Sequence, residues 1–124
     1  MENGKHVILV IDDNKDFLKA LVLLLEANGY AVHQAGSAKE GIKAYKKTNP
    51  DLILVDLMME EIDAGSNFAK ELKTLNNKAP VYLISSTGEI MSQAIDTVGL
   101  GFSGVIQKPY DKDELLSLLK TKLT

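Results

Sequence analysis

The feature that most constrains the fold is an alternation between short apolar runs and longer segments with helical periodicity. The run His6-Val7-Ile8-Leu9-Val10-Ile11 is typical of a buried strand, and the segment after it places Phe17, Leu21 and Leu25 on one helical face. This alternation occurs five times. The expected strands are residues 6–11, 31–35, 51–55, 80–84 and 104–107, and the expected helices are residues 14–28, 37–47, 66–75, 89–98 and 111–123.

Capping residues mark several of the expected helix ends. Ser37-Ala38-Lys39-Glu40 is a capping-box pattern, and Asp111 with Glu114 marks the start of the last helix. Gly29 is expected just beyond the end of the first helix, where glycine is the preferred residue.

Strands with apolar runs on both faces, separated by helices, predict a parallel sheet covered by helices on both sides. Right-handed crossovers leave few topologies, and for five strands the flavodoxin-like order 2-1-3-4-5 is the common one. With 124 residues and 13.5 kDa, the chain suits one domain. We therefore expect a single α/β domain over residues 1–124, a (βα)5 three-layer sandwich.

Composition excludes several function classes. The chain has no Cys and two His, which argues against disulfides, thiolate zinc sites, cysteine nucleophiles and histidine-based catalysis. All 14 basic residues are Lys, so the guanidinium fork that reads nucleic acids is missing and direct nucleic-acid binding is not expected. No apolar run approaches the roughly 20 residues of a membrane span, and no signal peptide is recognisable, so we expect a cytoplasmic protein without membrane insertion.

Polar residues stand at the carboxyl ends of four expected strands. Asp12 and Asp13 follow the first strand, Asp56 the third, Ser85 the fourth and Lys108 the fifth. In a sheet of this order, ligands bind outside the carboxyl ends, where the strand order reverses between strands one and three. We therefore expect these side chains to lie along one edge.

Three converging carboxylates repel one another, and a hard divalent cation with oxygen ligands relieves the repulsion. Mg²⁺ suits such a site because it uses one or two carboxylates and leaves positions for waters and a phosphate oxygen. Lys108 and a strand-four hydroxyl would contact phosphoryl oxygens. Asp56 is the best placed nucleophile, so the pattern predicts metal-dependent phosphorylation of an aspartate.

Each of these residues also has a purely structural interpretation. Asp12-Asp13 would cap the following helix, Asp56 would sit in a capped turn, and Lys108-Pro109 would form a loop. Their joint occurrence at four strand ends favours a site. The glycine pattern at residues 99–104 follows a helix and precedes a strand, the reverse of a dinucleotide fingerprint, and is interpreted as a turn.

Four motifs carry a family resemblance that covers essentially the whole chain. They resemble the receiver domain of two-component response regulators, and their order along the chain makes the combination specific. The motifs are Leu9–Asn14, Asp51–Met59, Pro80–Ser85 and Gln107–Tyr110.

The resemblance implies a role for each matching position. Asp56 would accept a phosphoryl group from a phosphohistidine on a sensor histidine kinase or phosphotransfer protein, and Ser85 and Lys108 would contact it. The chain would catalyse its own phosphorylation and dephosphorylation without turning over a separate substrate. It would signal by binding an output partner or domain, whose identity the sequence does not give.

The resemblance also implies the metal ligands. Asp13, Asp56 and the backbone carbonyl of Met58 would bind Mg²⁺, and Asp12 would act mainly through a metal-bound water.

Several positions depart from the family pattern. Glu60 replaces the usual Pro, Glu61 follows it, and the next loop is one residue longer. Val105 occupies the place of the aromatic residue whose movement usually accompanies signalling. Counting from Pro80 selects Ser85 as the hydroxyl, whereas counting back from Lys108 favours Ser86; we prefer Ser85 because strands vary less in length than loops.

Two functions of different class follow. The favoured one is a phosphorylatable receiver; the alternative is a receiver-like interaction module that does not switch, supported by Val105 and Glu60. A metal-dependent phosphohydrolase would need a further general acid or base, and none stands out.

Overall fold

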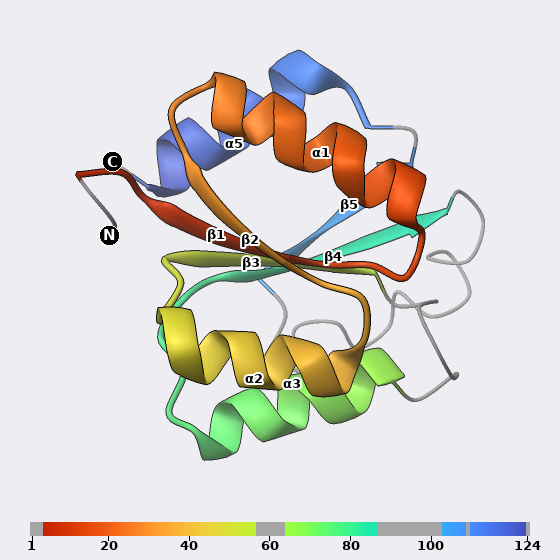
Figure 1. The fold of residues 1–124 in the computed structure, drawn as a ribbon, viewed down its shortest axis with the longest axis vertical. Helices are drawn as coiled ribbons and strands as arrows, with labels where there is room; N and C mark the ends of the chain where they lie inside the picture. Colours follow the sequence, from red (N-terminus) through yellow and green to blue (C-terminus); the bar gives the residue numbers. More distant parts are fainter. Residues whose placement is uncertain (1–3, 57–63, 87–102, 109, 124) are drawn as a thin grey trace.

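The computed structural model of the protein describes residues 4–56, 64–86, 103–108 and 110–123 (Figure 1). The helix expected at residues 89–98 lies outside this range, and the other expected elements are found. The third helix starts at Ala64, two residues earlier than expected. The elements are β1 (Val7–Ile11), α1 (Lys15–Ala27), β2 (Ala31–Ala35), α2 (Ala38–Thr48), β3 (Leu52–Asp56), α3 (Ala64–Thr74), β4 (Val81–Ser86), β5 (Gly104–Lys108) and α5 (Lys112–Lys122).

The strands form one parallel sheet in the order β2-β1-β3-β4-β5, which confirms the expected flavodoxin-like fold. Helices α1 and α5 cover one face, and α2 and α3 cover the other (Figure 1). The register pairs Ile11 with Val55 and Asp56 with Ile84. The carboxyl ends of β1, β3 and β4 therefore meet at the same edge of the sheet.

The core consists of two apolar clusters, one on each face of the sheet. Alternate residues of β1 belong to the two clusters. Leu9 and Ile11 face α2 and α3, while Ile8 and Val10 face α1 and α5. Every residue of β1 is fully buried, as expected for a strand covered on both sides. Burying a large aliphatic side chain stabilises the fold by roughly 1.5–3 kcal/mol, so these runs dominate its stability.

Helix α2 packs unusually close to the sheet at Gly41. A Cβ atom at this position would lie 2.5 Å from Ile11 Cδ1 and 3.2 Å from Phe68 Cε1. Because both side chains are buried, only glycine fits here without displacing the core.

The helix starts follow the capping residues identified in the sequence. Ser37 Oγ accepts a hydrogen bond from Glu40 N at 3.1 Å, and Asp111 Oδ1 accepts one from Glu114 N at 3.0 Å. Gly29 has φ of +90°, the left-handed conformation expected just beyond the end of α1.

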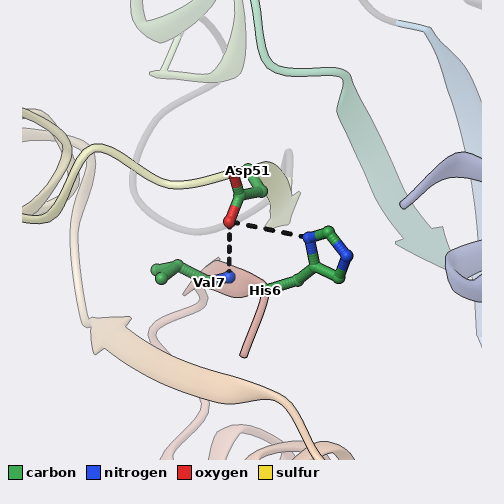
Figure 2. Close-up of polar contacts among 3 residues, drawn as sticks. All are labelled: His6, Val7 and Asp51. Atoms are coloured by element: carbon green, nitrogen blue, oxygen red, sulfur yellow. Dashed lines mark hydrogen bonds and ion pairs between the residues drawn. The ribbon is translucent and has the colours of Figure 1, made fainter. Parts of the chain in front are cut away.

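The amino ends of β1 and β3 are joined at the opposite edge (Figure 2). Asp51 Oδ2 accepts a hydrogen bond from Val7 N at 2.8 Å, and His6 Nδ1 lies 3.9 Å from the same oxygen. This contact is remote from the predicted site.

Candidate functional site at the carboxyl edge of the sheet

Two buried carboxylates lie next to each other in the sheet order. Asp12 directly follows β1 and is 1% exposed, and Asp56 ends β3 and is 6% exposed. Among the residues whose burial the structure describes, they are the only buried polar or charged ones. The last β1–β3 register pair is Ile11 with Val55, and Asp12 and Asp56 are the residues that follow these two in the chain. The sequence placed both at the switch point of the sheet, and the structure brings them together there.

Backbone hydrogen bonds fix Asp12 in place. Asp12 N donates to Ala35 O at 3.1 Å, and Asp12 Oδ1 accepts from Asn14 N at 2.9 Å. The N-cap of α1 is Asn14, whose Oδ1 accepts from Phe17 N at 3.1 Å. The interpretation of Asp12-Asp13 as the helix cap is therefore wrong, because a neighbouring residue performs that role.

Burial of two carboxylates in adjacent strands has an energetic cost. Removing an ionised group from water costs several kcal/mol unless a counter-charge or hydrogen bonds offset it. Asp13, in the same loop, is exposed. The arrangement is therefore a buried acidic pair with a third carboxylate at its solvent side.

An oxygen-only donor set of this kind fits Mg²⁺ better than a softer metal. Mg²⁺ commonly takes one or two carboxylates and completes its octahedron with waters and carbonyls. Among the residues that the structure describes, no three His, Cys, Asp or Glu side chains are grouped as a metal cage. Met58, the predicted carbonyl ligand, lies outside the described residues, as do Glu60 and Glu61.

Strands β4 and β5 end at the same edge. The register pairs Ser85 with Gln107 and Ser86 with Lys108. The structure thus places the backbone of the residues that carry the predicted hydroxyl and ammonium groups. Contacts of these groups with a phosphoryl group stay a prediction. The pairing leaves the choice between Ser85 and Ser86 open, as it was in the sequence.

An aromatic contact near this edge links the first turn of α1 to the segment before α5. The rings of Phe17, in the first turn of α1, and Tyr110, just before α5, meet edge to face with centroids 5.7 Å apart and an interplanar angle of 78°. Burial raises the pKa of Tyr110 above its usual value, so its hydroxyl stays neutral. This contact was not predicted from the sequence, in which the Tyr after Lys108-Pro109 was the available signal.

A groove of about 680 Å³ opens beside the acidic loop. Its apolar wall includes Leu18 and Val22 of α1, and Leu23 is 59% exposed. The cavity is also lined by Asp12, Asp13, Lys15, Lys19, Gln34, Ala35, Gly36 and Glu40. Sequence reasoning missed this groove; the exposed Leu23, which departs from the amphipathic pattern of α1, was the available signal.

The sheet order and the acidic edge define the class of the protein, an α/β domain of the receiver type, and comparisons with known proteins agree. The family model of the response regulator receiver domain matches residues 8–120. The chain is 30% identical to chemotaxis protein CheY of Bacillus subtilis over 119 residues, covering 95% of this chain and 98% of that protein. This chain therefore belongs to the response regulator receiver domains.

Other relatives combine such a domain with further sequence. The chain is 33% identical over 116 residues to the transcriptional regulatory protein GlrR of Escherichia coli, covering 94% of this chain and 26% of GlrR. It spans 49% of the probable transcriptional regulator ycf27 of Pyropia yezoensis. A response regulator receiver domain protein from Clostridium thermocellum superposes with a TM-score of 0.85 at 25% identity, covering 95% of this chain and 94% of that structure.

Membership in the family carries general expectations. Receiver domains typically depend on Mg²⁺, and response regulators have histidine kinases as partners. None of the helices described in the structure has the length and apolarity needed to cross a membrane.

Proposed function

We propose that this chain is a phosphorylatable receiver domain in which Asp56 is the phosphoacceptor. The observation that carries the proposal is the burial of Asp56 beside Asp12 at the switch point of the sheet. A carboxylate oxygen of Asp56 attacks the phosphorus of a phosphohistidine. The P–N bond breaks, its electron pair stays with the imidazole, which takes up a proton, and an aspartyl phosphate forms.

The other site residues have complementary roles. Asp13, Asp56 and the backbone carbonyl of Met58 would hold Mg²⁺, with Asp12 reaching it through a bound water. When bound, the ion supplies positive charge that offsets the repulsion between the acidic groups and the phosphoryl oxygens. Lys108 neutralises a further phosphoryl oxygen.

A strand-four hydroxyl donates a hydrogen bond to the phosphoryl group. We assign this role to Ser85, by its position after Pro80. Ser86, whose Cα pairs with that of Lys108, is the alternative.

The groove beside Asp12 and Asp13 is the surface that we assign to the phosphodonor protein. A histidine-carrying helix laid against Leu18, Val22 and Leu23 would bring its phosphoryl group to the acidic edge. Lys15 and Lys19 on the groove wall would attract an acidic helix face.

The phosphorylated domain then signals by binding an output partner or an output domain. In this proposal residues 1–124 form one cytoplasmic receiver domain that does not bind nucleic acid directly. Its own chemistry is limited to phosphotransfer onto Asp56 and hydrolysis of the resulting acyl phosphate.

The second candidate is an interaction module that does not switch. Val105 and Glu60 favour it, because both replace residues common in switching receivers. The buried Asp12–Asp56 pair favours phosphorylation, since a module without chemistry would gain stability from neutral residues at these two positions.

Intact-mass spectrometry distinguishes the two candidates. The parent chain is incubated with Mg²⁺ and acetyl phosphate, alongside Asp56→Asn and a sample containing EDTA. We expect one added phosphoryl group in the parent with Mg²⁺, and none in the variant or with EDTA. A parent chain that stays unlabelled with acetyl phosphate and with phosphoramidate would establish the non-switching module instead.

A further inference from the structure

Phe17 and Tyr110 connect two parts of the site that the sheet does not join directly. Strands β1 and β5 are separated by β3 and β4, so no backbone ladder runs between them. The edge-to-face contact of the two rings crosses this gap on the α1 and α5 face of the sheet. It therefore links the loop after β1 to the segment after β5.

A continuous set of contacts runs from the acidic loop to Tyr110. Asn14 N donates to Asp12 Oδ1 at 2.9 Å, and Phe17 N donates to Asn14 Oδ1 at 3.1 Å. The Phe17 ring then meets the Tyr110 ring. Tyr110 stands two residues after Lys108 in the chain.

We propose that Tyr110 is a positioning residue for phosphoryl transfer, which it serves by anchoring the Lys108 segment against Phe17. The proposal rests on the proposed function, because it assigns the anchored segment to the transfer step. A lysine side chain is long and flexible, so the place of its ammonium depends on how firmly the backbone beneath it is held. Phosphoryl transfer is catalysed mainly by positioning and charge, so a loosened segment lowers the rate.

The ring of Tyr110 makes the contact that the proposal needs. Aromatic pairs prefer the edge-to-face arrangement seen here, and an aliphatic side chain does not reproduce it. Phenylalanine retains the ring and loses only the hydroxyl. Tyr110→Phe is therefore the conservative variant, and Tyr110→Leu is the disruptive one.

The test measures the rate of Asp56 phosphorylation by acetyl phosphate at saturating Mg²⁺, for the parent, Tyr110→Leu, Tyr110→Phe, Phe17→Leu and the double Leu variant. Tyr30→Leu is the matched control, because Tyr30 packs against the same apolar cluster but lies just before β2, at the amino edge. Urea unfolding of each variant shows that it is folded under the assay conditions. The Mg²⁺ concentration that gives half the maximal rate is measured in parallel.

We expect Tyr110→Leu and Phe17→Leu each to slow phosphorylation by about tenfold, and the double variant to be no slower than either, because both remove the same contact. Tyr110→Phe and Tyr30→Leu should stay within about twofold of the parent, by the same reasoning. The half-saturating Mg²⁺ concentration should not change, because the acidic ligands are intact.

The outcomes separate this proposal from the one on which it rests. A parent chain that accepts no phosphoryl group overturns both. A labelled parent with Tyr110→Leu equally fast overturns the positioning role alone, as does a loss of rate in Tyr30→Leu that matches the loss in Tyr110→Leu. Additive effects in the double variant would also overturn it.

Discussion

Asp51 and Val7 bind each other through two hydrogen bonds. Asp51 N donates to Val7 O at 2.7 Å. Val7 N donates to Asp51 Oδ2 at 2.8 Å, the bond drawn in Figure 2. The pair closes the β1–β3 ladder just before its first register pair, Ile8 with Leu52. A side chain thus supplies an acceptor for an amide whose residue is fully buried.

Asp51→Ala should lower the free energy of unfolding by about 1–3 kcal/mol, because the buried Val7 amide loses its acceptor. Asp51→Asn should cost less than half as much, since an amide oxygen still accepts that bond. Urea unfolding followed by circular dichroism at pH 7 measures both. Equal losses in the two variants would mean that the carboxylate charge, for example its contact with His6, matters more than the hydrogen bond.

Asp56→Asn should raise the free energy of unfolding by about 1–2 kcal/mol without Mg²⁺, because it removes one of two buried like charges. Adding Mg²⁺ at ten times its dissociation constant should stabilise the parent by about 1.4 kcal/mol and the variant by much less. Thermal unfolding with Mg²⁺ and with EDTA checks this. An equal Mg²⁺ effect on both proteins would show that Asp56 is not a ligand.

Ionisation of Tyr110 should lower the free energy of unfolding at alkaline pH. Burial raises its pKa above the ordinary tyrosine value of 10.0, so the unfolded chain releases this proton at lower pH than the folded one. The contribution of protonated Tyr110 to the free energy of unfolding is fully present below the pKa of the unfolded state. It is lost as pH rises through the pKa of the folded state. Urea unfolding from pH 8 to 11 should show a smaller loss of stability in Tyr110→Phe than in the parent. Parallel pH profiles would contradict the assignment.

Leu23→Ser should separate protein donors from small ones. Transfer from a phosphorylated histidine kinase that labels the parent should slow by about tenfold if this exposed side chain contributes about 1.4 kcal/mol to docking. Phosphorylation by acetyl phosphate should be unchanged, because Leu23 is an exposed residue of α1 and is not one of the predicted phosphoryl or metal contacts. Lys70→Ser is the control for surface effects, because Lys70 is exposed on α3. Helix α3 covers the face of the sheet opposite to α1 (Figure 1). A loss with both donors would place the effect in the fold instead.

The strands and the acidic edge were predictable because they depend on local sequence. A run of aliphatic residues covered on both faces leaves little choice of structure, and a carboxylate at its end marks the edge of the sheet. Asp12 and Asp56 accordingly lie at the ends of β1 and β3, where the sequence predicted them, and their chemical roles stay predictions. α3 starts two residues before the expected position, which is within the one or two residues by which helix ends commonly differ.

The contacts that the sequence did not predict depend on tertiary geometry. Phe17 was assigned to the apolar face of α1, but its meeting with Tyr110 depends on how α1 and α5 pack on one face of the sheet. The different exposure of Asp12 and Asp13 was likewise hidden, because adjacent identical residues carry no signal of which one turns inward. The groove at Leu23 could not be predicted either, because one of its walls is formed by the chain between β2 and α2.

The cap at Asn14 has a consequence for how such domains diverge. Because Asn14 Oδ1 caps α1, the start of the helix requires no negative charge at the two preceding positions, and Asp12 supplies only an oxygen that accepts from Asn14 N. A descendant of this chain could carry Asn at positions 12 and 13, where an amide oxygen still accepts the bond from Asn14 N, and keep the fold. Two substitutions would then convert a signalling domain into an inert scaffold. They would remove predicted Mg²⁺ ligands, while the cap at Asn14 would preserve the start of α1.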